Sequence, residues 1–285
     1  MFSFPGKQPL RQWLADRIAP NASVLFVLST GRCGTTSLAS VLELSDRIHA
    51  THEPKPWYLE ETRNAYLQSP VPPETARANM EAFTSTRLKP LLRAATIGPI
   101  YAECSNRLTY YAPELLNWFP NSKYVHLYRH PGDVVRSGIR RGYYTGNSNW
   151  DLARITPRED DPAFEMWENW PQFERCCWYW HAVNAYCADF MRTLPEGRGL
   201  SIAAEDLFVN RDDIGTRVFE WLGAPPPPRG RIESVLSTPE NVQQSGDFPK
   251  YRDWTPAQRA TLNEIAGATA ARLGYEIRAD EPSIA

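Results

Sequence analysis

Four short apolar segments interrupt the chain, and each precedes a turn and a helical pattern. They are Ser23–Leu28, Ile100–Cys104, Lys123–Tyr128 and Leu200–Ala204. Segments of this length with few polar residues are typical of buried strands in a parallel sheet. Strand, turn and helix in repeated order predict an α/β fold in which helices flank both faces of a parallel sheet.

Amphipathic periodicity predicts the helices between and after these strands. The aromatic stretch at 164–190 predicts a long helix whose rings belong mainly to the core. At the carboxyl end, Thr255 is a predicted N-cap and Pro256 occupies the first helical position, where its missing N–H costs nothing. The predicted helices are Thr36–Leu44, Arg107–Trp118, Phe164–Phe190, Ile214–Leu222 and Thr255–Leu273.

Composition and charge narrow the classes of function. The chain has 285 residues, of which 42% are hydrophobic and 22% charged, which is typical of a globular protein. We predict a single domain over residues 1–285. The net charge of −2 gives no global field toward nucleic acid or an anionic membrane, so we expect neither as a partner. A site for an anion must therefore be built locally.

The cysteines and the amino-terminal segment bear on the compartment. The spacing of the five cysteines fits neither a zinc site nor a disulfide framework. Residues Met1–Ala22 contain no long apolar run, so we expect neither a signal peptide nor a membrane anchor. Both observations favour a cytoplasmic protein with reduced thiols. The five cysteines are Cys33, Cys104, Cys176, Cys177 and Cys187.

A candidate phosphate-binding loop lies at Ser29–Ser37, between the first strand and the first helix. Its glycines allow a sharp turn that brings backbone N–H groups toward one centre, and the helix adds its positive amino-terminal end. Arg32 adds a fixed charge. Three consecutive hydroxyls, Thr35, Thr36 and Ser37, add donors. The simpler interpretation is a turn that needs glycine for geometry alone.

The loop lacks two parts that a nucleoside triphosphatase needs. Aligned on Gly34 with the pattern G-x-x-x-x-G-K-[ST], it has Ser29 in place of the first glycine and Thr35 in place of the lysine. That lysine reaches the β- and γ-phosphates. No apolar strand ends in an aspartate that could hold magnesium. We therefore predict a loop that binds phosphate but lacks two parts needed to split a nucleoside triphosphate.

A second candidate anion site follows the third apolar strand. Arg129 stands at the carboxyl end of that strand, where ligands collect in open α/β sheets. Ser137 lies two helical turns further along, which brings it back beside the strand end. Both side chains can therefore meet one phosphate.

These two segments together resemble the 3′-phosphoadenosine 5′-phosphosulfate (PAPS)-dependent sulfotransferases. The stretch G-R-C-G-T-T at 31–36 is similar to the family's first loop, and R-H-P-G-D-V-V-R-S at 129–137 is similar to its second. Further similarity lies at 204–207, 219–223 and 273–275. The resemblance implies a P-loop nucleotide-kinase-like sulfotransferase fold, nearer the carbohydrate and protein-tyrosine branches than the cytosolic aryl branch.

The resemblance also implies a donor and its contacts. PAPS is the expected donor and 3′-phosphoadenosine 5′-phosphate (PAP) the product, with no metal required. Arg129 and Ser137 are expected to bind the 3′-phosphate. Cys33 replaces the family's usual serine, so a hydroxyl contact is lost there. The first loop is expected to bind the 5′-phosphosulfate through Gly31, Arg32, Cys33, Gly34, Thr35, Thr36 and Ser37.

The candidate base is Glu53 or His52, in the segment 49–54 that follows the first helix. Glu53-Pro54 resembles the glutamate element of the carbohydrate and protein-tyrosine branches, whereas the cytosolic branch uses a histidine. If both lie on a strand, only one of them can face the site, and we favour Glu53. The alternative is that Glu53 merely pairs with Lys55 or a nearby arginine.

The sequence does not identify the acceptor. The base element favours a hydroxyl, or an amine, of a carbohydrate, glycolipid or polar small molecule, and the polar stretch Gly142–Asp161 is a candidate loop over it. Two other functions stay open. One is an ATP-dependent small-molecule kinase, and the other is a nucleotide-binding module without catalysis. The oligomeric state is not predicted.

Overall fold

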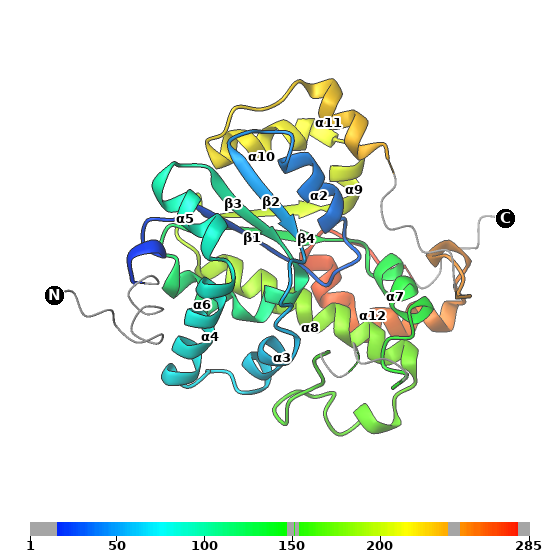
Figure 1. Cartoon of the computed structure of the whole chain (residues 1–285). Helices are drawn as coiled ribbons and strands as arrows, with labels where there is room; N and C mark the ends of the chain where they lie inside the picture. Colours follow the sequence, from blue (N-terminus) through cyan, green and yellow to red (C-terminus); the bar gives the residue numbers. More distant parts are fainter. Residues whose placement is uncertain (1–15, 147–150, 152–153, 239–245, 279–285) are drawn as a thin grey trace.

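Five parallel strands form the central sheet of this computed structural model, which describes residues 16–146, 151, 154–238 and 246–278 (Figure 1). The strand order is β2-β3-β1-β4-β5, and all four pairings are parallel. The strands are β1 (Val24–Leu28), β2 (Ile48–His52), β3 (Ile100–Cys104), β4 (Lys123–Tyr128) and β5 (Gly199–Ala203). The α/β parallel fold predicted from the apolar segments is confirmed.

Burial follows position in the sheet. Every residue of the central strand β1 is buried, while the edge strands β2 and β5 keep partly exposed positions. Helices cover both faces, as Figure 1 shows: α2, α10 and α11 lie on one side of the sheet and α6, α8 and α12 on the other. These six helices are α2 (Thr35–Leu42), α6 (Ala112–Trp118), α8 (Gln172–Thr193), α10 (Ile214–Leu222), α11 (Arg229–Leu236) and α12 (Pro256–Arg272).

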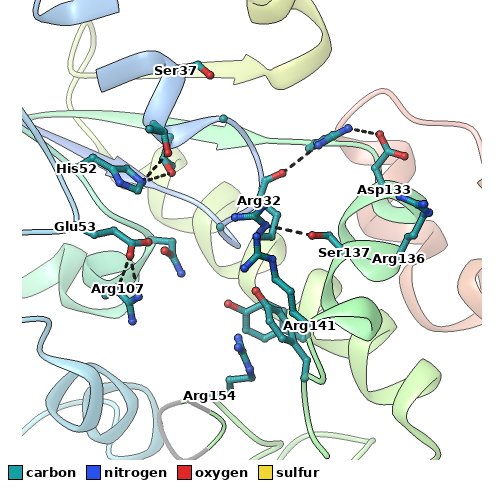
Figure 2. A pocket seen from close by; sticks show the side chains of 18 of the residues that line it. Arg32, Ser37, His52, Glu53, Arg107, Asp133, Arg136, Ser137, Arg141 and Arg154 are labelled. Carbon is teal, nitrogen blue, oxygen red and sulfur yellow. Dashed lines mark hydrogen bonds and ion pairs between the residues drawn. The ribbon is translucent and has the colours of Figure 1, made fainter. Parts of the chain in front are cut away.

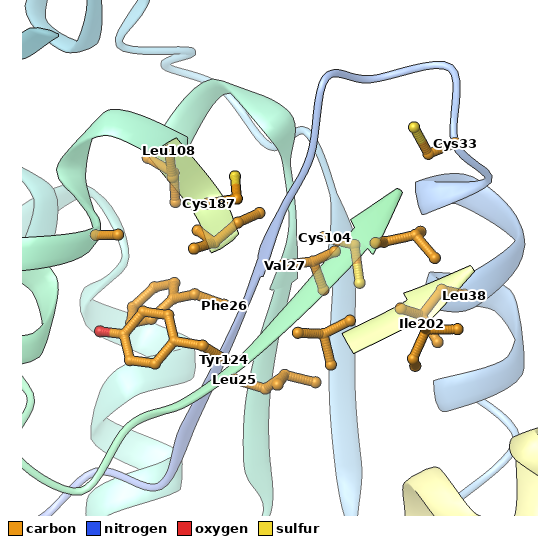
Figure 3. Packing of buried hydrophobic residues seen from close by; sticks show 14 of the residues in the cluster. Leu25, Phe26, Val27, Cys33, Leu38, Cys104, Leu108, Tyr124, Cys187 and Ile202 are labelled. Atoms are coloured by element: carbon orange, nitrogen blue, oxygen red, sulfur yellow. The ribbon is translucent and has the colours of Figure 1, made fainter. Parts of the chain in front are cut away.

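An aromatic cluster around Phe26 fills the core on one face of the sheet (Figure 3). Its ring lies 5.8–6.0 Å, centroid to centroid, from those of Phe83, Phe119 and Tyr124. Tilted aromatic pairs at this spacing add about 0.5–1.5 kcal/mol each beyond burial of their area. They fix the sheet against α4 (Pro73–Thr86), which carries Phe83, and thereby the strand ends from which the site is built.

Most helix predictions hold, but two need correction. The predicted helix Arg107–Trp118 is a 3₁₀ helix over Asn106–Tyr111 followed by α6. The long aromatic helix begins at Gln172, not Phe164, after a separate 3₁₀ turn at Trp167–Asn169. Pro171 is the reason, because a residue before proline is driven to extended backbone, and Trp170 has ψ 130°. Thr255 caps α12 with a full capping box to Gln258, as its sequence predicts.

Among the described residues, five α-helices were not predicted individually, one of them a short helix that starts at Ala204, and three of the five form one insertion. The helices α3 (Leu59–Leu67), α4 and α5 (Leu88–Thr96) fill the connection between β2 and β3, while α11 follows the proline patch. All five cysteines are buried and free. No helix in the described ranges is both long and apolar enough to cross a membrane. Most of the segment Met1–Ala22 lies outside the described residues.

Candidate active site

The carboxyl ends of the strands open into a cavity of about 940 Å³. Segments that follow β1, β2, β3 and β4 line it, which is where parallel α/β sheets place ligands. Ten of the eleven predicted site residues line this cavity. They are Gly31, Arg32, Gly34, Thr35, Thr36, Ser37, His52, Glu53, Arg129 and Ser137.

The phosphate loop has the backbone conformation that its glycines allow. Gly31, Arg32 and Gly34 have φ values of 73°, 61° and 88°, in the left-handed region. A side chain at Gly34 would also place its Cβ 2.8 Å from the ring of Phe208. Gly34 is the N-cap of α2, and the first N–H groups of a helix have no partner within it. The helix end is thus directed at the cavity.

Neighbouring elements hold the loop from outside. Thr109 accepts a hydrogen bond from Ser29 N–H and donates one to the Ser29 carbonyl, each at 3.2 Å. The hydroxyl of Tyr179, on α8, donates to the Thr30 carbonyl at 3.0 Å. Tyr179 also lines the cavity, so this residue of the aromatic helix contributes to the pocket wall as well as to the core.

Cys33 is the predicted site residue that the structure places elsewhere. Its side chain is fully buried and does not line the cavity, and Figure 3 shows it among the core residues. Burial raises the pKa of its thiol to about 11, although a hydrogen bond with Thr30 opposes the shift. Only its backbone is therefore available to a ligand.

The two anion-binding segments meet at Arg32 (Figure 2). Its Nε donates to the Ser137 hydroxyl at 3.2 Å, which joins the phosphate loop to α7 (Pro131–Arg140). Arg129 donates to Asp133 at 2.6 Å and to the Arg32 carbonyl at 3.4 Å. Burial lowers the pKa of Arg32, and the positive charges of Arg141 and Arg129 act in the same direction. Such crowding of like charges is expected where an anion belongs.

The carboxylate of Glu205 holds the second anion-binding segment in place through two hydrogen bonds. Glu205 accepts from the His130 N–H at 2.9 Å and from the hydroxyl of Tyr275 at 2.7 Å. Glu205 is the second residue of the short helix α9 (Ala204–Phe208), and Tyr275 lies just beyond α12. Two of the further family-like stretches, 204–207 and 273–275, therefore meet here and fix the turn that carries Arg129.

Both candidate bases, His52 and Glu53, line the cavity. The prediction that only one of them can face the site is therefore wrong. The alternation argument required Glu53 to lie on a strand, but β2 ends at His52 and Glu53 has φ 43°. Nε2 of His52 lies 3.1 Å and 3.2 Å from the hydroxyls of Thr35 and Thr36. His52 therefore contacts the phosphate loop, while Glu53 turns toward another partner.

That partner is Arg107, so the pairing of Glu53 with a nearby arginine, stated as the alternative, is present in the structure. Sequence reasoning did not identify Arg107 as a residue of the site. Its Nε and Nη2 lie 3.1 Å and 2.8 Å from Oε2 of Glu53. Arg107 belongs to the 3₁₀ helix η1 (Asn106–Tyr111), which starts where β3 ends. Trp57 packs against the Arg107 guanidinium and donates from its indole to the Glu53 carbonyl. The sequence does contain a signal for Arg107, because a basic residue just after the predicted strand Ile100–Cys104 lies at the edge of the sheet where ligands bind.

A buried ion pair holds the segment after Glu53. Arg87 and Glu103 have side chains only 4% and 1% exposed and are joined by two 3.0 Å hydrogen bonds. Arg87 also donates to the carbonyls of Pro54, Lys55 and Pro56 at 2.8–3.0 Å. Glu103, near the end of β3, therefore holds Arg87 in place and is not among the described residues that line the cavity.

The cavity as a whole is strongly cationic, although the chain has a net charge of −2. Among the described residues that line it, only Glu53 and Asp133 carry carboxylates. Within the described ranges, no cluster of three or more His, Cys, Asp or Glu could hold a metal ion. The lining arginines are Arg32, Arg63, Arg107, Arg129, Arg136, Arg140, Arg141 and Arg154.

Comparisons with known proteins agree with this geometry. Residues 24–228 match the family described as "Sulfotransferase family". The chain belongs to the sulfotransferase family. In this sulfotransferase, the matched range contains both anion-binding segments and all five strands of the sheet. Membership of the family implies PAPS as the sulfuryl donor. A comparison with curated proteins finds no match.

Solved structures share the fold at low sequence identity. The sulfotransferase domain from the curacin biosynthetic pathway aligns with a TM-score of 0.53 and 16% identity, over 90% of this chain and 99% of that one. Sulfotransferase STF9 from Mycobacterium avium aligns with a TM-score of 0.54 and 14% identity, over 93% and 80%. A sulfotransferase from Alicyclobacillus acidocaldarius gives 0.50 and 16%, over 89% and 94%. These matches show that the chain has the sulfotransferase fold.

Proposed function

We propose that this sulfotransferase moves the sulfuryl group of PAPS to a hydroxyl, or an amine, of a carbohydrate, glycolipid or polar small molecule and releases PAP. The observation that carries the proposal is the join between the two anion sites. Arg32 reaches from the phosphate loop to Ser137, beside Arg129, in one cationic cavity. A donor with phosphate groups at two ends of a nucleoside fits that arrangement.

In the proposed transfer, different residues of the site bind the donor, stabilise the leaving group and accept the proton. The phosphate loop and Arg32 hold the 5′-phosphosulfate, and Arg129 with Ser137 holds the 3′-phosphate. The acceptor oxygen forms a bond to sulfur as the bond from sulfur to the bridging phosphate oxygen breaks, and that oxygen keeps the electron pair. Arg32 stabilises the charge that grows on the departing phosphate, a form of electrostatic catalysis. The proton of the acceptor goes to a base.

Glu53 is the base that the contacts favour. Arg107 binds Oε2 of Glu53, so the other carboxylate oxygen is available to an acceptor hydroxyl. His52 instead contacts Thr35 and Thr36 of the phosphate loop. A glutamate base supports the proposal that the chain is nearer the carbohydrate and protein-tyrosine branches of the family than the cytosolic aryl branch. Five buried, free cysteines support a cytoplasmic location.

A titration of nucleotides tests the donor assignment. PAP and ATP are titrated against the protein, each with magnesium and with a chelator. Because both phosphates are held by protein donors, PAP should bind in chelator as well as in magnesium and more tightly than ATP. Tight ATP binding that requires magnesium would favour a kinase. PAP binding with no turnover of PAPS on any acceptor would favour a nucleotide-binding module.

Paired variants test the base. Glu53→Gln keeps the size of the side chain and removes its basicity, so turnover should fall about 10²–10⁴-fold while PAP affinity stays near the wild-type value. Glu60→Gln, on the exposed side of α3 and outside the cavity, is the matched control. An inactive His52→Ala enzyme beside an active Glu53→Gln enzyme would move the base to His52.

A further inference from the structure

Three arginines line the part of the cavity away from the phosphate motifs. Arg107 comes from η1, Arg63 from α3, and Arg154 from the segment that follows α7. Figure 2 shows Arg107 to the left of Arg32 and Arg154 below it, whereas Asp133 and Arg136 lie to the right. The segments that carry them are not those that resemble the donor-binding motifs. This part of the cavity is therefore the acceptor side.

Two of the three arginines already have a carboxylate partner. Arg107 pairs with Glu53 at 2.8 Å, and Arg154 pairs with Asp151 at 3.1 Å. Arg154 also lies over the ring of Tyr143, which holds its guanidinium in place. Each positive charge is thus balanced before a ligand enters.

Arg63 differs, because no ion pair to it exists in the described part of the chain. Its Nε donates to the backbone carbonyl of Arg154 at 3.1 Å, which orients the guanidinium and leaves its terminal nitrogens to other acceptors. The residue is half-buried and lines the cavity. A guanidinium oriented by one neutral carbonyl in a partly desolvated site is suited to a charge-assisted bond with an oxyanion.

The donor does not account for Arg63. Five other arginines also line the cavity: Arg32, Arg129 and Arg136 lie in the two donor-binding motifs, and Arg140 and Arg141 lie at the end of α7, which carries Ser137. Leu59 and Thr62 of α3 and Tyr110 of η1 line the same cavity as Arg63, and α3 and η1 pack against each other. A cation among these residues is placed to read the acceptor.

We propose that the acceptor carries an acidic group, a carboxylate or a sulfate ester, close to its reacting hydroxyl, and that Arg63 binds this group. The inference rests on the proposed function and makes it more specific. The acid would give the acceptor side the balancing charge that the described residues do not supply to Arg63. It would also hold the hydroxyl at one distance from Glu53.

Matched pairs of acceptors test the proposal on the PAP-loaded protein and in turnover with PAPS. One pair is methyl β-D-glucuronide and methyl β-D-glucoside, which differ by a carboxylate. The other is N-acetylglucosamine 6-sulfate and N-acetylglucosamine, which differ by a sulfate ester. The two pairs distinguish the two sources of the oxyanion. The variants are Arg63→Gln and, as a control, Arg93→Gln on the exposed side of α5.

We expect at least one acidic member to bind the PAP-loaded protein about ten- to a hundredfold more tightly than its neutral partner, the range of a charge-assisted bond. Arg63→Gln should abolish that ratio, and Arg93→Gln should keep it. Equal or weaker binding of both acids, or a ratio that survives in Arg63→Gln, would overturn the inference. Turnover of neutral acceptors alone would overturn it while leaving the sulfotransferase assignment intact. Failure of PAP itself to bind would instead count against the proposed function.

Discussion

Replacing Arg87 by Met tests the support behind the candidate base. Arg87 makes five hydrogen bonds, two to Glu103 and three to the carbonyls of residues 54–56. The substitution leaves the Glu103 carboxylate buried without its cation, since that side chain is 1% exposed. Breaking a buried ion pair from one side costs about 3–5 kcal/mol of unfolding free energy. We expect Arg87→Met to lose stability in that range.

The double variant Arg87→Met/Glu103→Leu separates charge from packing. With both charges removed, the desolvation penalty disappears, so the double variant should be more stable than Arg87→Met alone. The carbonyls of residues 54–56 still lack their donor, and the hydroxyl of Tyr101 loses Glu103 as its acceptor. Turnover of PAPS should therefore remain low in the double variant, because the segment that follows Glu53 is no longer held.

Urea unfolding followed by circular dichroism measures all four corners of this cycle, with Glu103→Leu as the other single variant. The two charges should show a coupling energy of more than about 1 kcal/mol. Additive losses, or a loss below about 1 kcal/mol for Arg87→Met, would refute the ion pair as a buried support. Wild-type turnover in a folded double variant would refute its role in placing Glu53.

Three further predictions concern the donor, the thiols and acid stability. Arg129→Ala should weaken PAP about ten- to a hundredfold and weaken adenosine 5′-phosphosulfate, which lacks the 3′-phosphate, far less; equal losses in calorimetry would show that Arg129 does not read the 3′ position. Because all five cysteines are buried and burial raises the pKa of Cys33 to about 11, a disulfide reagent should label none of them in the native protein and five after unfolding. Burial lowers the pKa of His126 to about 4, so the unfolded chain, with a pKa near 6.5, takes up this proton first and stability falls as pH drops from 6.5 toward 4. At pH 5 this difference in proton uptake lowers the unfolding free energy by about 2 kcal/mol. His126→Gln should therefore lose about that much less unfolding free energy than the wild type between pH 7 and 5, as measured by urea unfolding. An identical loss in both proteins would show that His126 does not contribute.

The sequence by itself determined the features that depend on near neighbours. The strand β4 has the predicted bounds, and the phosphate loop follows β1 because a buried apolar run, two glycines and a helix start are adjacent in the chain. Thr255 and Pro256 start α12 as their local chemistry requires. Parallel strands then bring their carboxyl ends to one edge, so Arg32 and Arg129 meet although 97 residues separate them.

Only the tertiary structure decided what surrounds the reacting centre. Whether Glu53 shared a face with His52 depended on where β2 stops, and a one-residue difference in a strand end reverses the direction of a side chain. Arg107, Arg87 and Arg63 come from η1, α4–α5 and α3, whose packing no local pattern specifies. The side chain of Cys33 turned into the core for the same reason. Contacts between distant segments arise from how the elements pack around the sheet, and that packing depends on the whole chain at once.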